Sequence, residues 1–213
     1  MTMAVVVAVS YVIGSVPFAL LLARRFGSDD LRRVGSGNLG AANVARASGV
    51  VAGVLVALLD ASKGALSVAL APSLSQVPGA AAVAGFAAIV GHVYPIWLKF
   101  RGGKGVATAC GVFAVLAPMA VVPAVTIFAI TVSVTKYISL GSVLASLALP
   151  PLAFVAGSST PVTVAASAAA GLIVFRHRSN LLRLRAGREV RFSRRARGSD
   201  PRADANGSQA DRT

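Results

Sequence analysis

Charged side chains are scarce in this chain of 213 residues, because Asp, Glu, Lys and Arg together make up only 13% of it. Soluble domains carry roughly 25%, and a soluble fold with half that supply could not cover its surface with polar groups. Hydrophobic residues make up 55%, and the mean hydropathy is +0.74. That excludes intrinsic disorder for most of the chain. The composition therefore predicts an integral membrane protein with several spans.

Cysteine, histidine and acidic residues are also rare. Cys110 is the one cysteine and lies in an apolar run, which excludes a disulfide framework and a thiolate metal site. The two histidines, His92 and His177, are far apart in the sequence. The acidic residues of the first 180 positions are Asp29, Asp30 and Asp60. The sequence therefore predicts neither a metal site nor a cofactor.

Six apolar runs, separated by short polar stretches, are candidates for membrane spans. They are Met3–Ala23, Ala47–Ala71, Val77–Leu98, Gly105–Thr135, Ser139–Ala156 and Pro161–Phe175. The fourth run has 31 residues, and one helix of that length would measure about 46 Å, well beyond a hydrocarbon core of about 30 Å. Pro118 and Pro123 interrupt this run, so two shorter helices are the alternative.

The basic residues decide between one helix and two in this run. With two helices, 20 of the 21 Lys and Arg residues fall on one side of the membrane, and Lys63, inside a span, is the exception. With one helix, Lys136 and the Arg-rich C-terminal region would change sides. The positive-inside rule therefore favours seven transmembrane helices, with the N-terminus outside and the C-terminus in the cytoplasm. We expect an all-α membrane domain over residues 1–192 in the plasma membrane and a disordered tail over 193–213.

The first cytoplasmic loop reads GSGNLGAANVAR over residues 35–46. It matches the G-x-G-x-x-G pattern, but a dinucleotide site needs a preceding strand, and here a membrane span precedes. Glycine-rich backbone can still wrap an anion with its N–H groups, and the Arg fork suits phosphate. The candidate phosphate-binding residues are Ser36, Gly37, Asn38, Gly40, Asn43 and Arg46. A flexible connector is the alternative.

The second segment reads GHVYPIWLKFRGGKGVAT over residues 91–108. It is not a Walker A motif, because Gly105 follows Lys104 where Ser or Thr is required. Gly102, Gly103 and Lys104 nevertheless stand directly before a predicted helix, whose free N–H groups would favour a phosphate. Four side chains also suit a belt at the lipid headgroups, with which a site can coexist: Tyr94, Trp97, Lys99 and Arg101. His92 is a candidate binding residue or, alternatively, a packing residue near a helix end.

Two further segments carry pairs of polar residues at helical spacing. In KYISLGS (136–142), Ser139 and Ser142 share one helix face, although Ser139 could simply cap the helix. In HRSNLLRLRAGRE (177–189), His177 and Asn180 share a face in the same way. A basic amphipathic helix on anionic lipid would explain the arginines of that segment, but not His177 and Asn180 at the membrane boundary.

Asp60 and Lys63 lie three residues apart inside the second predicted span. Charges in a bilayer core are costly, by about 2.5–3.5 kcal/mol each on insertion scales. We therefore expect the two side chains to pair with each other within the bundle. A proton or ion path is the alternative.

Taken together, the four segments resemble the bacterial acyl-phosphate:glycerol-3-phosphate acyltransferase (PlsY) family over roughly Tyr11–Glu189. LLDASKG and YVIGSVPFALLLAR are also similar to that family. The chain departs from the family pattern at Ala42, where Thr is usual, at Lys136, often Arg, and at Ser179, usually Glu. We expect the missing hydroxyl at position 42 to weaken one hydrogen bond to substrate.

The resemblance implies a seven-helix enzyme that transfers an acyl group from acyl phosphate to the 1-hydroxyl of sn-glycerol 3-phosphate. The products would be lysophosphatidic acid and phosphate, and neither acyl-CoA nor acyl carrier protein would serve as donor. The expected partners are these substrates and membrane lipid, not nucleic acid. The sequence agrees in one respect, since the His-x-x-x-x-Asp pattern of soluble-type glycerolipid acyltransferases is missing: Trp97 and Leu182 stand at that spacing after His92 and His177.

Within that reaction, the residues receive provisional roles. Ser36, Gly37, Asn38 and Gly40 would bind one phosphate, and Arg46, Lys104 and Asn43 the glycerol 3-phosphate. The groups expected to orient the hydroxyl or stabilise the oxyanion are His177, Asn180, Ser139 and Ser142. No carboxylate in the motifs is expected to act as base. His177 is a candidate base, and proton uptake by the donor's own phosphate is the alternative.

Two other classes of function are open to the sequence. Glycines, cations and an intramembrane Asp–Lys pair would also suit a transporter of a phosphate ester or other anion. Against it, the predicted outer turns carry no binding groups, and no inverted repeat is visible. A lipid-anchored scaffold would depend on its basic tail, and we expect truncation after about Phe192 to be tolerated instead.

Overall fold

The computed structural model describes residues 2–25, 31–33 and 37–192. Within these ranges the chain is helical and contains no β-strand, which confirms the predicted all-α class. Ser36 and the predicted disordered tail lie outside the described residues. The elements are α1 (Met3–Gly14), α2 (Phe18–Arg25), α3 (Ala41–Ser48), α4 (Val50–Leu74), α5 (Ala80–Val93), the 3-10 helix η1 (Ile96–Leu98), α6 (Val106–Leu116), α7 (Pro118–Thr135), α8 (Ile138–Val155), α9 (Thr160–Arg176) and α10 (Arg178–Arg185).

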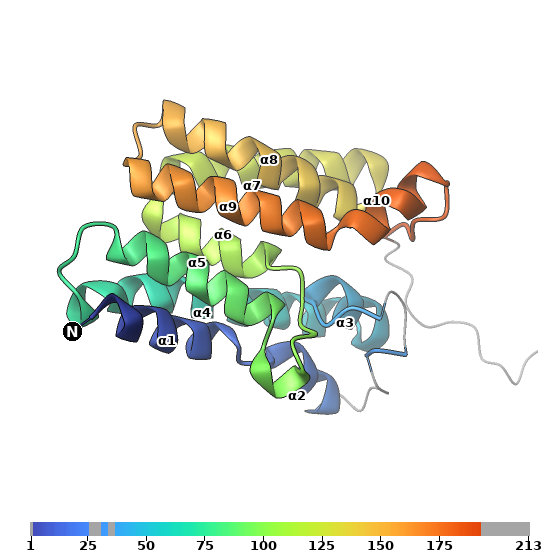
Figure 1. The fold of residues 1–213 in the computed structure, drawn as a ribbon. Coiled ribbons are helices and arrows are strands. Elements are labelled where there is room, and N and C mark those ends of the chain that lie inside the picture. The colour runs from blue at the N-terminus through green and yellow to red at the C-terminus, as the bar shows by residue number, and fades with distance from the viewer. Residues whose placement is uncertain (1, 26–30, 34–36, 193–213) are drawn as a thin grey trace, which may run out of the picture.

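The longer helices form a bundle in which α1 and α4 to α9 run along a common direction, while α2, α3 and α10 gather at the end away from the N-terminus (Figure 1). Five segments are long and apolar enough to cross a membrane, and α6 and α9 are shorter apolar helices. The five are Met3–Arg25, Val50–Leu74, Ala80–Leu98, Pro118–Thr135 and Ile138–Val155. The helices at the common end carry basic residues in their last turns.

The first apolar run is one candidate span, Met3–Arg25, as expected, but it is built from two helices. α1 ends at Gly14 and α2 begins at Phe18. Pro17 lacks an N–H and disfavours helical backbone at Val16. The carbonyl of Val16 accepts a hydrogen bond of 2.9 Å from Lys63 Nζ, so a side chain from another helix satisfies part of the broken turn.

The run Gly105–Thr135 is divided as the basic residues predict. Ala117 leaves the helical region with φ −149° and ψ 62°, which ends α6. Pro118 then occupies the first turn of α7, where its missing N–H costs no helical hydrogen bond. The prediction of two helices in this run is confirmed.

Helices α4 and α6 pack closely against each other at positions occupied by glycine. A Cβ on Gly111 of α6 would collide with the backbone of Ala61 on α4, and one on Gly64 of α4 with the backbone of Thr108 on α6. Small residues allow helix backbones to approach in this way, which is how membrane helices gain packing contacts. The backbones of α4 and α6 are therefore in contact at Ala61, next to Asp60 on α4.

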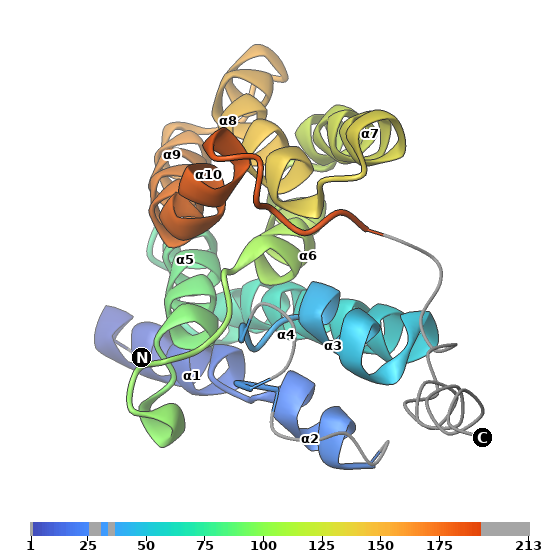
Figure 2. The same ribbon diagram turned by 90° about the vertical axis from the view of Figure 1, so that its right-hand side faces the viewer.

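Residues 187–192, which we call the C-terminal strap, return from α10 to the connection between α7 and α8 (Figure 2). The N–H of Phe192 donates to the carbonyl of Lys136 at 2.7 Å. Arg191 Nε donates to the Tyr137 hydroxyl at 3.2 Å, and its guanidinium lies 5.5 Å from the centre of that ring. The strap is thus held at both ends, by α10 and by the α7–α8 connection.

Candidate active site

A cavity of about 440 Å³ lies among α3 to α10 and the strap. Its lining changes character along the helices. Ser139 and Ser142 come from the first turns of α8, whereas Leu149 lines the cavity about two turns further in. On α9, Ala169 lies about 12 Å deeper than His177, which follows the end of the helix. The cavity therefore has a polar mouth and an apolar interior.

The polar mouth collects most of the residues that the sequence analysis selected. Ten of them line this one cavity: Asn38, Gly40, Asn43, Arg46, His92, Lys104, Ser139, Ser142, His177 and Asn180. Gly37, at φ 67°, does not line it, and Ser36 is outside the described residues. Gly102 and Gly103 line a second, smaller cavity instead. Four segments distant in sequence thus converge at one end of the bundle.

A chain of hydrogen bonds crosses the mouth of the cavity. Lys104 Nζ donates to Asn180 Oδ1, and Asn180 Nδ2 donates to Glu189 Oε1 at 2.6 Å. The other carboxylate oxygen of Glu189 accepts from Arg183 Nε at 2.9 Å. We call Lys104, Asn180, Arg183 and Glu189, together with Arg46, the mouth cluster.

The cations of the mouth cluster outnumber its single acid. Burial lowers the pKa of Lys104 to about 8, the negative charge of Glu189 opposes this, and the nearby Arg183, Arg176 and Arg46 add to it. Lys104 is therefore mostly protonated at neutral pH. Such an excess of positive charge in a partly buried mouth attracts anions.

His177 is buried and neutral at physiological pH. Burial lowers its pKa to about 4, and the positive charge of Lys104 adds to this. Its Nδ1 lies 2.8 Å from the carbonyl oxygen of Ile173. Because that carbonyl can only accept, the geometry assigns the proton to Nδ1 and leaves Nε2 as an acceptor.

Two buried polar atoms at the mouth have no hydrogen-bond partner within the described residues: Arg46 Nε and Ser139 Oγ. The Ser139 hydroxyl approaches the Glu189 carboxylate outside good hydrogen-bond geometry. The alternative that Ser139 caps its helix is wrong, because Tyr137 is the N-cap residue and no side chain caps α8. Ser142 Oγ donates to the carbonyl of Ile138 at 2.9 Å, so its oxygen remains an acceptor. Buried polar atoms left unpaired are expected where a ligand completes the structure.

The phosphate seat expected at Gly102 and Gly103 needs correction. Their backbone N–H groups donate to the carbonyls of Val93 and His92, both at 3.1 Å. Those donors are consumed inside the protein and are not free to bind a phosphate. The mouth is reached instead by the next residues, Lys104, Gly105 and Val106, at the start of α6.

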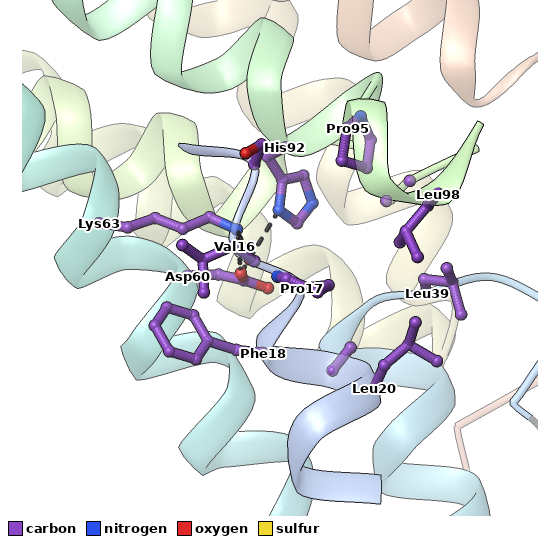
Figure 3. Close-up of a pocket in the computed structure, with 14 residues that line it drawn as sticks. Val16, Pro17, Phe18, Leu20, Leu39, Asp60, Lys63, His92, Pro95 and Leu98 are labelled. Carbon is purple, nitrogen blue, oxygen red and sulfur yellow. Dashed lines mark hydrogen bonds and ion pairs between the residues drawn. The ribbon is translucent and has the colours of Figure 1, made fainter. Parts of the chain in front are cut away.

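A second polar group, the inner cluster, consists of Asp60, Lys63 and His92 (Figure 3). Lys63 Nζ lies 2.7 Å from Asp60 Oδ1, and His92 Nδ1 lies 3.4 Å from the same oxygen. The cavity beside them measures about 10 Å³, room for about one water molecule. The predicted pairing of Asp60 with Lys63 is confirmed. No group of three or more His, Cys, Asp or Glu among the described residues could hold a metal ion.

The sequence analysis missed Glu189. We expected no carboxylate in the motifs to act as base and did not select Glu189 for any role, yet this side chain lines the cavity and is 5% exposed. Burial raises the pKa of Glu189, but the side chains of Asn180, Ser139 and Arg183 that approach its carboxylate outweigh burial and hold the pKa below its usual value. A sequence signal existed, because Glu189 is the one acid in an otherwise basic segment and stands two residues after Gly187, a residue type that permits a chain reversal.

Comparison with known proteins gives consistent matches. A family model described as glycerol-3-phosphate acyltransferase matches residues 4–187. Proteins named glycerol-3-phosphate acyltransferase from Syntrophotalea carbinolica and Geobacter sulfurreducens are 46% and 45% identical, covering 86% and 88% of this chain and 94% and 96% of theirs. A crystal structure of PlsY, an integral membrane glycerol 3-phosphate acyltransferase in its glycerol 3-phosphate form, matches with a TM-score of 0.84 at 38% identity, covering 90% of this chain and 96% of that one. Its lysophosphatidic acid form matches with a TM-score of 0.80.

Proposed function

The chain belongs to the glycerol-3-phosphate acyltransferase family, and we propose that its cavity transfers an acyl group from acyl phosphate to the 1-hydroxyl of sn-glycerol 3-phosphate. The products are lysophosphatidic acid and inorganic phosphate. The observation that carries the proposal is a single cavity with a cationic mouth and an apolar interior. One substrate is a soluble phosphate ester and the other a phosphate on an acyl chain, so the reaction needs both environments side by side.

Glycerol 3-phosphate occupies the mouth. Arg46 and Lys104 bind its phosphate, because a charge-assisted hydrogen bond to phosphate is roughly twice as strong as a neutral one. The unpaired Arg46 Nε supports this role. Asn38 and Asn43 line the same mouth, although Asn43 Nδ2 also donates to the carbonyl of Leu31 at 2.9 Å. Asn43 therefore supports the loop as well as facing the substrate.

The acyl chain of the donor occupies the apolar interior. α4 and α7 both line the cavity and both pack on α6, while sharing almost no contact with each other. Ala57 and Leu58 of α4 face this side of the cavity, as do Val125 and Phe128 of α7. The donor enters between these two helices from the hydrocarbon, with its phosphate at the mouth.

The 1-hydroxyl attacks the acyl carbonyl carbon, a carbon–oxygen bond forms, and the bond from that carbon to the phosphate oxygen breaks. His177 Nε2 accepts a hydrogen bond from the hydroxyl and aims it. A group with a pKa of about 4 is a weak base at neutral pH. The departing phosphate gains negative charge as its bond breaks, so it takes the hydroxyl proton.

The developing oxyanion on the acyl carbon needs donors close to it. Asn180 has a second N–H besides the one that meets Glu189, and the Ser139 hydroxyl has no partner of good geometry among the described residues. These two groups stabilise the oxyanion, with Ser142 beside them. Such stabilisation and proximity suffice because acyl phosphate is already activated, so no acyl-enzyme is needed.

We also propose seven membrane crossings, the N-terminus outside, and the mouth at the cytoplasmic face of the plasma membrane. The five long apolar segments together with α6 and α9 supply seven crossings. The basic last turns of α2, α3 and α10 at one end of the bundle support the orientation. Residues 1–192 form the catalytic membrane domain and 193–213 a dispensable tail.

The direct test offers the purified protein in detergent palmitoyl phosphate, palmitoyl-CoA or palmitoyl-acyl carrier protein, each with and without glycerol 3-phosphate. We expect lysophosphatidic acid and phosphate only from palmitoyl phosphate with acceptor present. Phosphate release without acceptor would indicate hydrolysis and would contradict the proposal. In sealed vesicles, uptake of glycerol 3-phosphate without acyl product would favour the transporter instead.

A further inference from the structure

The C-terminal strap inserts an acidic side chain into a mouth that is otherwise cationic. Asp60 and Glu189 are the two acidic residues that the structure describes, and Asp60 is already paired with Lys63. Glu189 faces positive groups from three parts of the chain: Arg46 on α3, Lys104 before α6 and Arg183 on α10. An acid in a phosphate-binding mouth repels the substrate, so its presence calls for a reason.

The contacts of Glu189 supply that reason. An Asn amide can present either its oxygen or its nitrogen to a neighbour. Because Glu189 accepts only from a donor, it fixes Nδ2 of Asn180 on its own side. Asn180 Oδ1 is thereby turned toward the ammonium group of Lys104. The carboxylate therefore holds Lys104 in place through Asn180.

The anchoring of the strap shows that this contact is built in. Glu189 lies between Gly187, at φ 67°, and the pair of Arg191 and Phe192, which are tied to Tyr137 and Lys136. The carboxylate is 5% exposed, and both of its oxygens accept hydrogen bonds. A carboxylate that the substrate displaces on binding would not need a hydrogen-bond donor on each of its oxygens.

We propose that Glu189 is a positioning residue for acyl transfer, which orients the Asn180 amide and, through it, holds the Lys104 ammonium group in place at the mouth. This inference rests on the proposed function of the cavity. The competing interpretation is a plug, in which the carboxylate occupies the place of a substrate phosphate and leaves when the substrate binds.

The two interpretations predict opposite changes in Glu189→Gln. The positioning role predicts that kcat falls by about 10–100-fold. It also predicts that the loss of activity at high pH begins at a lower pH, because the negative charge that keeps Lys104 protonated is gone. The groups that face Lys104 are then only positive or neutral: Arg46, Arg176, Arg183 and His177. A plug predicts instead a lower KM for glycerol 3-phosphate and an equal or higher kcat.

The experiment measures kcat and the KM for glycerol 3-phosphate from pH 6 to pH 9.5 for the wild type, Glu189→Gln and Glu189→Asp. Arg188→Gln is the matched control, because Arg188 is the exposed neighbour on the strap and does not line the cavity. We expect Glu189→Asp to keep the wild-type pH profile with a partial loss of kcat. Arg188→Gln should match the wild type in both respects.

The outcomes distinguish the proposed function of the cavity from the role of Glu189 within it. An inactive wild type would overturn the proposed function and this inference with it. An active wild type with an unimpaired Glu189→Gln, or one with the plug signature, overturns the inference alone. Should Glu189→Gln lose the fold, Glu189→Asp decides: a reduced kcat with an unchanged pH profile supports positioning, and an unchanged kcat overturns it.

Discussion

The inner cluster and the mouth cluster are both charged and lie near each other, since Asp60 and His92 line both cavities. The inner cluster is buried and the mouth cluster is partly buried. They differ in how completely their charges are matched. In the inner cluster Lys63 meets Asp60 and a backbone carbonyl, and the adjoining cavity is about 10 Å³. In the mouth cluster cations exceed acids, and the cavity is about 440 Å³.

This difference distinguishes a charge that stabilises from a charge that binds. Breaking a buried ion pair by removing one partner typically costs about 3–5 kcal/mol. The matched inner cluster is therefore placed to secure the bend between α1 and α2. The unmatched mouth cluster keeps unpaired groups, such as Arg46 Nε, for a ligand. Four substitutions or conditions test this contrast, in order of their expected effect on turnover.

The largest effect on turnover should come from Lys104→Ala in the mouth cluster. A hydrogen bond to a charged group is worth about 1.5–3 kcal/mol, so we expect kcat/KM for glycerol 3-phosphate to fall by about 10²-fold with the fold retained. Arg101→Ala is the control, because it removes an exposed cation from the same loop without touching the cavity. Equal losses in the two variants would mean that general charge, not the mouth, attracts the substrate.

Raising the pH should reproduce part of that loss. Lys104 has a pKa of about 8 and is a cation below that value, so its charge is present at pH 7 and mostly gone at pH 9. We expect a fall of about tenfold in kcat/KM over this interval. Lys104→Arg should abolish this limb of the profile, because the guanidinium does not deprotonate. A wild-type profile that stays flat to pH 9.5 would contradict the assignment.

His177→Ala should reduce kcat by no more than about tenfold. A general base typically contributes about 10²–10⁴-fold, whereas a hydrogen bond that orients a hydroxyl contributes less. Because the pKa of His177 is about 4, His177 stays neutral between pH 5 and pH 7, and its titration should cause no fall in activity over that range. A loss of about 10³-fold with an intact fold would restore His177 as the base.

The smallest effect on turnover, and the largest on stability, should come from Lys63→Met in the inner cluster. Asp60, left with His92 as its neighbour and without the ammonium group, should lower thermal stability in detergent strongly, while kcat of the folded fraction changes less than about threefold. Adding Asp60→Asn should recover part of the stability, because the lone charge is removed. If Lys63→Met instead abolished turnover without lowering stability, the inner cluster would take part in catalysis as the mouth cluster does, and the contrast between them would be wrong.

The sequence predicted the helical bundle and the division of the fourth apolar run well, because Pro118 and the distribution of Lys and Arg are local signals. It did not predict the break at Pro17, since that run carries no charge and the compensating group, Lys63, comes from a distant helix. Ten of the residues selected from the motifs line one cavity, and their roles in it stay predictions.

The remaining misses concern tertiary contacts that no spacing reveals. The N–H groups of Gly102 and Gly103 look free in the sequence but donate to the carbonyls of Val93 and His92 at the end of α5. Glu189 lies nine residues after Asn180, beyond any helical repeat, and reaches it only because the chain reverses after Gly187. Both features depend on loops whose course is set by long-range packing.

The side of the cavity between α4 and α7 has a kinetic consequence. If the donor arrives there from the hydrocarbon, its effective concentration is a mole fraction in the micelle or bilayer, not a molarity in the buffer. We therefore expect that adding inert detergent at constant total donor slows turnover and raises the apparent KM for the donor. The KM for glycerol 3-phosphate, expressed as its aqueous concentration, should not change.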